Sequence, residues 1–82
     1  MLKLKEIRIK KGLLQRDIAN ILGVTQSAAS LYELEERKLN QDQIIKLCLE
    51  LDVTPDELLG FKEAYEKYVD YLISMTKDNI NN

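Results

Sequence analysis

The sequence predicts an all-helical fold, and three observations support that prediction. Apolar residues recur at steps of three and four along most of the 82 residues. Thr and Asn, which cap helices, stand where several of these runs begin. Gly totals 3 and Pro 1, which leaves no compositional linker and no repeat at solenoid spacing. A chain of this length buries only a modest core, so we expect its stability to depend partly on dimerisation.

The first two helices follow from the apolar spacing. Leu4 and Ile7 lie on one stripe of a helix that runs to Gly12, a residue suited to the left-handed conformation that ends helices. In LLQRDIANILG, apolar residues again fall at three- and four-residue steps, which predicts a second helix over about residues 14–22.

The third helix begins after a very short connection. Thr25 offers a side-chain oxygen to cap a helix over about residues 25–34. Two helices joined by about three residues around a glycine cross steeply, which is helix-turn-helix geometry. Ala19 is small enough for the next helix to approach, and Gly23 can adopt positive φ. The residues expected to bury apolar surface behind the turn are Val24, Ala29 and Tyr32.

Three further helices are expected. Asn40 caps a fourth helix, whose apolar residues are Ile44, Ile45, Leu47, Cys48 and Leu51. The segment VTPDELL predicts a short fifth helix with Thr54 as its cap and Pro55 at its first position. Glu57 follows the cap by three residues, in a capping-box arrangement. A last helix is expected from Phe61 onward.

The residue types needed for metal or catalytic chemistry are scarce. With no His and one Cys, neither a zinc site nor a Ser/His or Cys/His pair can be assembled. We therefore expect no enzymatic activity and no cofactor, and interpret Cys48 as a small buried hydrophobic residue rather than a reactive thiol. The apolar runs are at most three residues long and MLKLKEIRIK lacks a signal-peptide core, which predicts a cytoplasmic protein without membrane contact.

Charge is distributed unevenly along the chain. Residues 1–38 carry eight Lys or Arg and five acids, a net charge of +3. Residues 39–82 carry four Lys and nine acids, a net charge of −5, so that the whole chain has −2. A polyanion, if one binds, is therefore expected at the first half.

The segment from Leu2 to about Phe61 resembles a phage repressor or Cro-like helix-turn-helix domain of the Xre family. The resemblance rests on LKEIRIKKGLLQRDIANILGVTQSAASLYE and IIKLCLELDVTPDELL and covers about three quarters of the chain. It implies a five-helix, lambda-repressor-like DNA-binding domain over residues 1–60, from a family that binds operator DNA as dimers.

The resemblance also implies roles for individual residues. Gln15 would orient a phosphate contact and support the neighbouring side chain, while Thr25, Gln26 and Ser27 would open the recognition helix. Arg8 and Glu33 match a pair that is commonly salt-bridged in the family, tying the first helix to the end of the third. That pair is structural and reads no bases.

Direct readout requires side chains in the first turns of the recognition helix. Gln26 can form a bidentate pair with adenine, and Ser27 and Ser30 can donate or accept hydrogen bonds without strong preference. The alternative for Gln26 is a solvated polar residue on an exposed face. The candidate phosphate contacts, each of which could instead only solubilise the surface, are Gln15, Arg16, Thr25, Lys10, Lys11, Arg37 and Lys38.

The sequence departs from the family pattern near the end of the recognition helix. A glycine usually follows the Glu that closes this helix, whereas ELEERK stands here, which is expected to lengthen the helix or reshape the loop. Ala29 is smaller than the usual branched residue, and Leu31 occupies a position where a polar reader is common. We expect modest affinity per domain and specific binding that depends on two domains acting together.

The last helix, in FKEAYEKYVDYLISMTKDN, carries its own apolar stripe. Steps of four, three, four and three separate the residues of this seam, which are Phe61, Tyr65, Tyr68, Leu72 and Met75. We expect residues 61–82 to form a dimerisation helix followed by a polar, frayed tail, KDNINN. The alternative is a helix that folds back over its own five-helix core.

The resemblance thus implies a homodimeric transcriptional regulator, most simply a repressor, of bacterial or phage origin that binds double-stranded operator DNA. Two alternatives stay open at this stage. One is an antitoxin-type regulator that also masks a toxin through the aromatic stripe. The other is a protein-interaction module that retains the fold and binds a partner protein instead of DNA, which the acidic balance permits.

Overall fold

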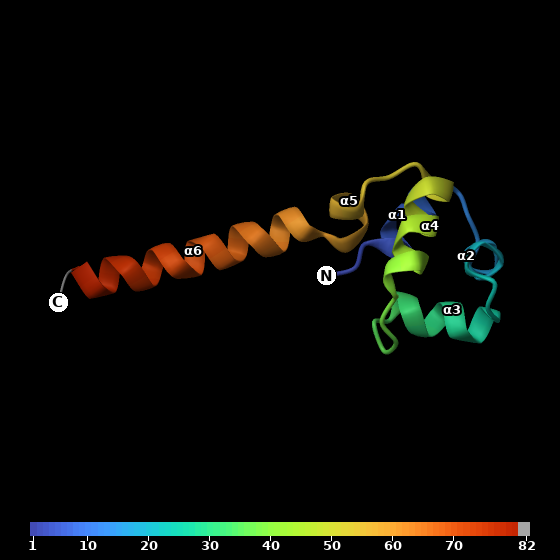
Figure 1. The fold of residues 1–82 in the computed structure, drawn as a ribbon, viewed down its shortest axis with the longest axis horizontal. Coiled ribbons are helices and arrows are strands. Elements are labelled where there is room, and N and C mark those ends of the chain that lie inside the picture. The colour runs from blue at the N-terminus through green and yellow to red at the C-terminus, as the bar shows by residue number, and fades with distance from the viewer. Residues whose placement is uncertain (81–82) are drawn as a thin grey trace.

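Six helices follow one another in the computed structural model, which describes the backbone of residues 1–80 and the side chains of residues 1–76 (Figure 1). They are α1 (Leu4–Lys10), α2 (Gln15–Leu22), α3 (Gln26–Glu33), α4 (Gln41–Leu51), α5 (Pro55–Leu59) and α6 (Phe61–Ile80). The predicted all-helical class is confirmed. The expected frayed tail, KDNINN, is wrong for residues 77–80, because their backbone continues α6. Residues 81–82, and the side chains of residues 77–80, lie outside the described part.

The helix ends follow the capping residues of the sequence. Gly23 ends α2 with φ +67°, and the Thr25 hydroxyl oxygen accepts a hydrogen bond from the Ala28 amide at 3.1 Å. At the start of α4, Asn40 and Gln43 form a reciprocal capping box, with bonds of 2.8 and 2.9 Å.

The cap of α5 forms only in part. The Thr54 hydroxyl oxygen accepts a hydrogen bond from the Glu57 amide at 3.2 Å, and Pro55 is the first helical residue, as expected. In the described part of the chain, the Glu57 carboxylate accepts no hydrogen bond from the Thr54 amide, which would complete the capping box. The Glu57 side chain is instead exposed to solvent. The expected capping box is therefore half present.

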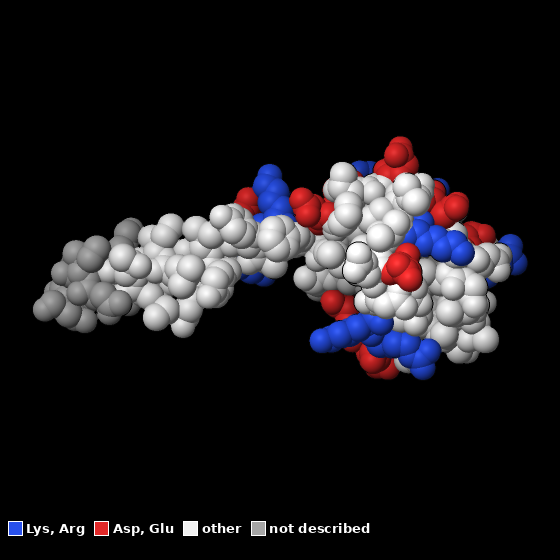
Figure 2. All heavy atoms as spheres, viewed as in Figure 1, with Lys and Arg blue, Asp and Glu red and all other residues white. Residues whose placement is uncertain are grey.

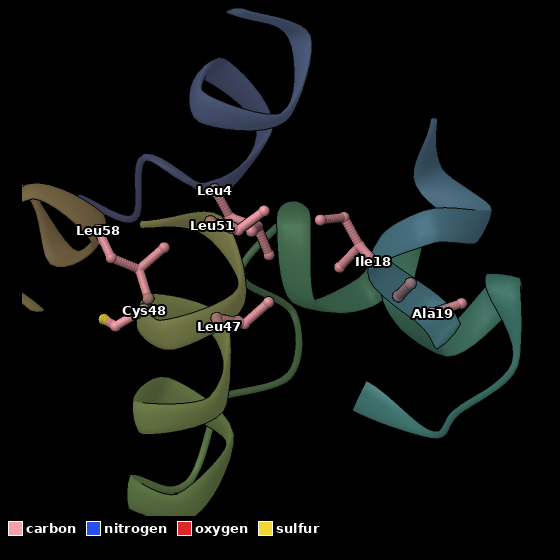
Figure 3. Packing of buried hydrophobic residues seen from close by; sticks show 8 residues of the cluster. Leu4, Ile18, Ala19, Leu47, Cys48, Leu51 and Leu58 are labelled. Carbon is pink, nitrogen blue, oxygen red and sulfur yellow. The ribbon is translucent and has the colours of Figure 1, made fainter. Parts of the chain in front are cut away.

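The core lies where the first five helices meet (Figure 3). Its largest fully buried side chains are Leu4, Ile18, Leu47 and Leu58. Each buried leucine or isoleucine stabilises the fold by about 1.5–3 kcal/mol relative to an exposed one. Ala19 and Ala29 are also buried, as expected, whereas Val24 is half-buried and packs against the edge of the core.

Cys48 belongs to the same cluster and is 8% exposed. Burial is the main reason that the pKa of its thiol is raised, with the nearby charge of Glu57 adding to the effect. A raised pKa keeps the thiol neutral near pH 7, so Cys48 behaves as the small hydrophobic residue that the sequence suggested.

Helix α6 projects away from the five-helix domain instead of folding back over it (Figure 1). The molecule measures 55 × 23 × 21 Å, and the long axis follows this helix. All five residues of the expected seam are between 42% and 61% exposed. None of the described helices combines the length and the apolarity that crossing a bilayer requires.

Candidate nucleic-acid interface

The turn between α2 and α3 fixes how α3 is presented. The left-handed backbone of Gly23 lets the Val24 amide donate to the Ala19 carbonyl oxygen at 3.0 Å, which closes α2 and redirects the chain. Ala19 and Ala29 are 4% and 0% exposed, so the small side chains allow α2 and α3 to pack closely. Close packing against α2 therefore fixes the orientation of α3 and of its outer face.

Four polar residues gather at the exposed start of α3. Gln15 of α2 and Gln26, Ser27 and Ser30 of α3 line one open hollow of about 440 Å³. Gln26 and Ser27 are exposed, whereas Gln15 and Ser30 are half-buried. The structure thus brings together the three residues expected to contact bases and one of those expected to contact phosphate.

The half-buried Gln15 belongs to a hydrogen-bond network at the C-terminal end of α3. Its amide nitrogen donates to Glu33 Oε2 at 3.0 Å, and Arg8 Nε donates to Glu33 Oε1 at 2.5 Å. The Glu33 side chain is 3% exposed and that of Arg8 14%, so this ion pair is largely removed from solvent. Arg8 also donates to the Leu13 carbonyl oxygen at 3.2 Å. The network joins α1, α2 and α3 at one point.

Thr25 uses its hydroxyl oxygen as the cap of α3, which places its exposed side chain at the positive end of the helix dipole. Because the backbone amides of the first helical turn also point this way, the start of α3 favours a negatively charged group such as a phosphate.

None of the basic residues expected to contact phosphate lines this hollow. Arg16 is exposed in the first turn of α2. Lys10 lines a different hollow, beside Lys3 and Glu63 near the start of α6. Lys11, Arg37 and Lys38 are exposed as well, and the Arg37 guanidinium lies 5.9 Å from the centre of the Tyr32 ring. On the face shown in Figure 2, Lys or Arg and Asp or Glu are interspersed over the five-helix domain.

The loop after α3 shows what replaces the expected glycine. Helix α3 ends at Glu33 and Glu35 adopts φ +60°, a left-handed conformation that is uncommon for residues other than glycine. The Glu35 carboxylate accepts a hydrogen bond from the Leu2 amide at 3.1 Å. The loop is therefore reshaped and α3 is not lengthened. No local spacing predicts this bond, because its partners are 33 residues apart.

Two other contacts were also missed by sequence reasoning. The Gln43 side-chain nitrogen donates to the Tyr32 hydroxyl oxygen at 3.1 Å, which links α4 to the last turn of α3. Lys3 Nζ lies 2.9 Å from Glu63 Oε2, which links the N-terminus to α6. Neither pair has a characteristic spacing in the sequence. Within the described residues, no three His, Cys, Asp or Glu side chains lie close enough to hold a metal ion.

Comparison with known proteins places these observations in a family. The family described as Helix-turn-helix matches residues 4–58. The HTH-type transcriptional regulator ImmR of Bacillus subtilis is 34% identical over 74 residues, which are 90% of this chain and 58% of ImmR. YqaE of the same organism, described as an uncharacterized HTH-type transcriptional regulator, is 39% identical over 56 residues, which are 68% of this chain and 48% of YqaE. The chain thus spans about half the length of these relatives. No solved structure matches the chain significantly.

Proposed function

Because the chain belongs to the helix-turn-helix family, we propose that it is a DNA-binding transcriptional regulator that acts as a homodimer on a near-palindromic operator. The observation that carries this proposal is the hollow at the start of α3, where Gln26, Ser27 and Ser30 meet Gln15 of α2. The names of the relatives ImmR and YqaE, both called HTH-type transcriptional regulators, support it.

In this proposal the start of α3 enters the major groove. Gln26 is exposed at the first position of α3, where a side chain can reach base edges, and its amide can pair with N6 and N7 of adenine. Ser27 and Ser30 add less selective hydrogen bonds. The Arg8–Glu33 pair holds α3 in place without contacting DNA, and the hydrogen bond from Gln15 to Glu33 orients Gln15 beside the start of α3.

Phosphate contacts would position the domain without reading sequence. Thr25 and Arg16 lie at the starts of α3 and α2, where the helix dipoles also favour phosphate. Gln15 would contribute a contact from within the hollow, and the remaining contacts would come from Lys10, Lys11, Arg37 and Lys38. Since the basic residues are interspersed with acids, we expect modest affinity for one domain.

Dimerisation would occur through α6. The seam residues Phe61, Tyr65, Tyr68, Leu72 and Met75 lie on one face of the helix at the spacing of a coiled-coil contact. On the side visible in Figure 2, the described part of α6 beyond its root carries no charged residue. A two-fold pair of such helices would present one α3 per subunit to successive major grooves, roughly 34 Å apart. Bound over a promoter, the dimer would repress by excluding the polymerase.

A salt-titrated binding assay with duplex DNA from upstream of the protein's own gene tests this function. We expect the Gln26→Ala variant to bind the specific duplex about 10- to 100-fold more weakly, since one good bidentate base pair contributes about 1–3 kcal/mol. Gln41→Ala is the matched control, because Gln41 is also an exposed first residue of a helix but belongs to α4.

The salt dependence separates phosphate contacts from base contacts. Arg16→Glu should weaken binding to specific and scrambled duplexes alike and reduce the slope of log affinity against log salt. Equal, weak binding of the wild-type protein to every duplex would contradict the proposal. That result would favour a partner protein or toxin as the binding partner, with the exposed aromatic face of α6 as the surface to examine.

A further inference from the structure

We propose that the N-terminal arm, residues Met1–Lys3, determines the operator spacing by bracing α6 against the five-helix domain. The proposal rests on the proposed function, because spacing matters only for a dimer that binds two half-sites. Lys3 and Gly60 are the positioning residues of this brace, and neither needs to contact DNA.

A single residue controls the direction of α6. Gly60 alone separates α5 from α6, and its backbone is left-handed, with φ +61° and ψ 31°. The Ala64 amide already bonds to the Gly60 carbonyl oxygen at 3.3 Å, so α6 follows the glycine directly. A helix of 20 residues is about 30 Å long, and a 10° rotation at its root moves its tip by about 5 Å. Small changes at Gly60 are therefore amplified along α6.

The arm fixes this root from three directions. The Lys3 amide donates to the Leu58 carbonyl oxygen at 2.7 Å, which ties the arm to α5. Lys3 Nζ lies 2.9 Å from Glu63 Oε2 in the first turn of α6. The Met1 carbonyl oxygen packs against the open face of Gly60, where a Cβ atom would come within 2.4 Å of it. The arm thus contacts the helices on both sides of the connecting glycine.

The arm also contacts the loop that follows α3. The Leu2 amide donates to Glu35 Oε1 at 3.1 Å, in the loop directly after α3. Three consecutive residues therefore connect the end of α3 with the start of α6. In a dimer joined through α6, this connection would fix the distance and rotation between the two copies of α3.

The ion pair is the weaker part of the brace. The hydrogen bond and charge of Glu63 raise the pKa of Lys3, and Lys3 in turn lowers the pKa of Glu63, so both are charged at neutral pH. The Glu63 side chain is 63% exposed, however, and exposed ion pairs contribute little. Close packing at Gly60 is the stronger constraint, because it leaves no room for even one methyl group.

Gly60→Ala is the direct test, with Gly12→Ala as its matched control. Both glycines have positive φ and incur the same backbone strain when replaced, but a Cβ at Gly12 meets no atom within 4 Å. Both variants would be bound to operators whose half-sites are moved apart one base pair at a time. We expect wild type and Gly12→Ala to lose about tenfold or more in affinity one base pair from the optimum, since each step rotates the half-sites around the duplex. Gly60→Ala should flatten or shift this profile.

A charge exchange tests the arm without altering the glycine. Lys3→Glu and Glu63→Lys should each broaden the spacing profile. The double variant should restore it in part, because the exchanged pair can reform while Glu6, whose Oε1 lies 3.9 Å from Lys3 Nζ, repels a carboxylate at position 3. A merely structural role would lower stability without changing the preferred spacing. The proposal would be overturned if the wild-type protein has a clear spacing optimum and Gly60→Ala and both single charge variants have the same optimum and the same profile.

A measurement without DNA separates this inference from the proposed function. Spin labels are attached to Asn20→Cys and Asp70→Cys in a Cys48→Ala background, and the labelled protein is diluted with unlabelled protein. The distance between the two labels reports how α6 is oriented relative to the five-helix domain. We expect a narrow distance distribution for wild type and Gly12→Ala and a broad or shifted one for Gly60→Ala. Equal distributions would overturn the brace. If no duplex binds specifically, the proposed function fails while these distances still test the brace.

Discussion

At the scale of single residues, the Glu33 carboxylate is a charged group that is buried in the domain and therefore requires partners. It is almost fully buried and accepts hydrogen bonds from both Arg8 and Gln15. A buried charge is tolerated only when it is paired, and removal of one partner leaves an uncompensated charge in the interior. The pair therefore holds α1 and α3 together only while it is complete.

Replacing Arg8 by Met tests this dependence. We expect the free energy of unfolding to fall by about 3 kcal/mol, because Glu33 would lose its counter-charge. Urea denaturation measures the change, and Lys5→Met, which removes an exposed cation from the same helix, should alter stability by less than about 0.5 kcal/mol. Equal effects of the two substitutions would contradict the role given to Glu33.

Cys48 gives a second test at this scale. Burial raises the pKa of its thiol, so little thiolate is present near pH 7 and the sulfur is shielded from reagents. We expect iodoacetamide to alkylate Cys48 at least about tenfold more slowly in the folded protein than in urea. Alkylation at the same rate under both conditions would show that the core around α4 opens readily.

Among the elements, α3 depends most on its first residues. It has eight residues, and a helix this short is marginal without tertiary packing and a cap. Thr25 supplies the cap and Ala29 and Tyr32 supply the packing, while Gln26 and Ser27 remain exposed to solvent. This short helix therefore depends both on packing of its buried face and on the cap at its first turn.

We expect Thr25→Ala to lower the free energy of unfolding by about 1 kcal/mol, because the Ala28 amide loses its hydrogen-bond acceptor. Thermal or urea denaturation without DNA measures this effect separately from any phosphate contact. Ser27→Ala serves as the control, since Ser27 lies in the same exposed turn but does not cap the helix. A larger loss from Ser27→Ala than from Thr25→Ala would contradict the assignment of the cap.

At the scale of the whole molecule, the protein consists of a five-helix domain and a projecting helix (Figure 1). An isolated helix that exposes several aromatic rings presents more apolar surface than monomeric proteins usually leave in contact with water. Phe61 stacks on Tyr65 and Tyr68 on Tyr71, with ring centres 5.9 and 6.4 Å apart, so these rings form preformed pairs. This surface supports the proposal of a dimer.

Leu72→Glu tests dimerisation, with Ser74→Glu as its matched control. Both substitutions introduce the same charge into α6, but Leu72 lies on the seam and Ser74 on the opposite, polar face. Sedimentation equilibrium should show a monomer for Leu72→Glu and a dimer for wild type and Ser74→Glu. We also expect Leu72→Glu to bind a two-site operator about 100-fold more weakly, because the linked second domain is lost. A monomeric wild-type protein would contradict the proposal.

The sequence alone predicted all six helices and most of their ends. Apolar spacing depends on the helical period, and caps depend on side chains within three residues, so both are local properties. The positive φ of Gly23 and the hydrogen bond at Thr25 followed from single residue types. The expectation for ELEERK was open between two outcomes, because the conformation of Glu35 depends on a distant partner.

Short-range spacing is therefore sufficient to predict the class of fold, the helix-turn-helix element and the residues at the start of α3. The direction of α6 and the contacts of the N-terminal arm with Glu35, Gly60 and Glu63 could be found only in the folded chain. These features join residues more than 30 positions apart. Such pairs leave no periodic pattern in the sequence, since their proximity arises only after the core has folded.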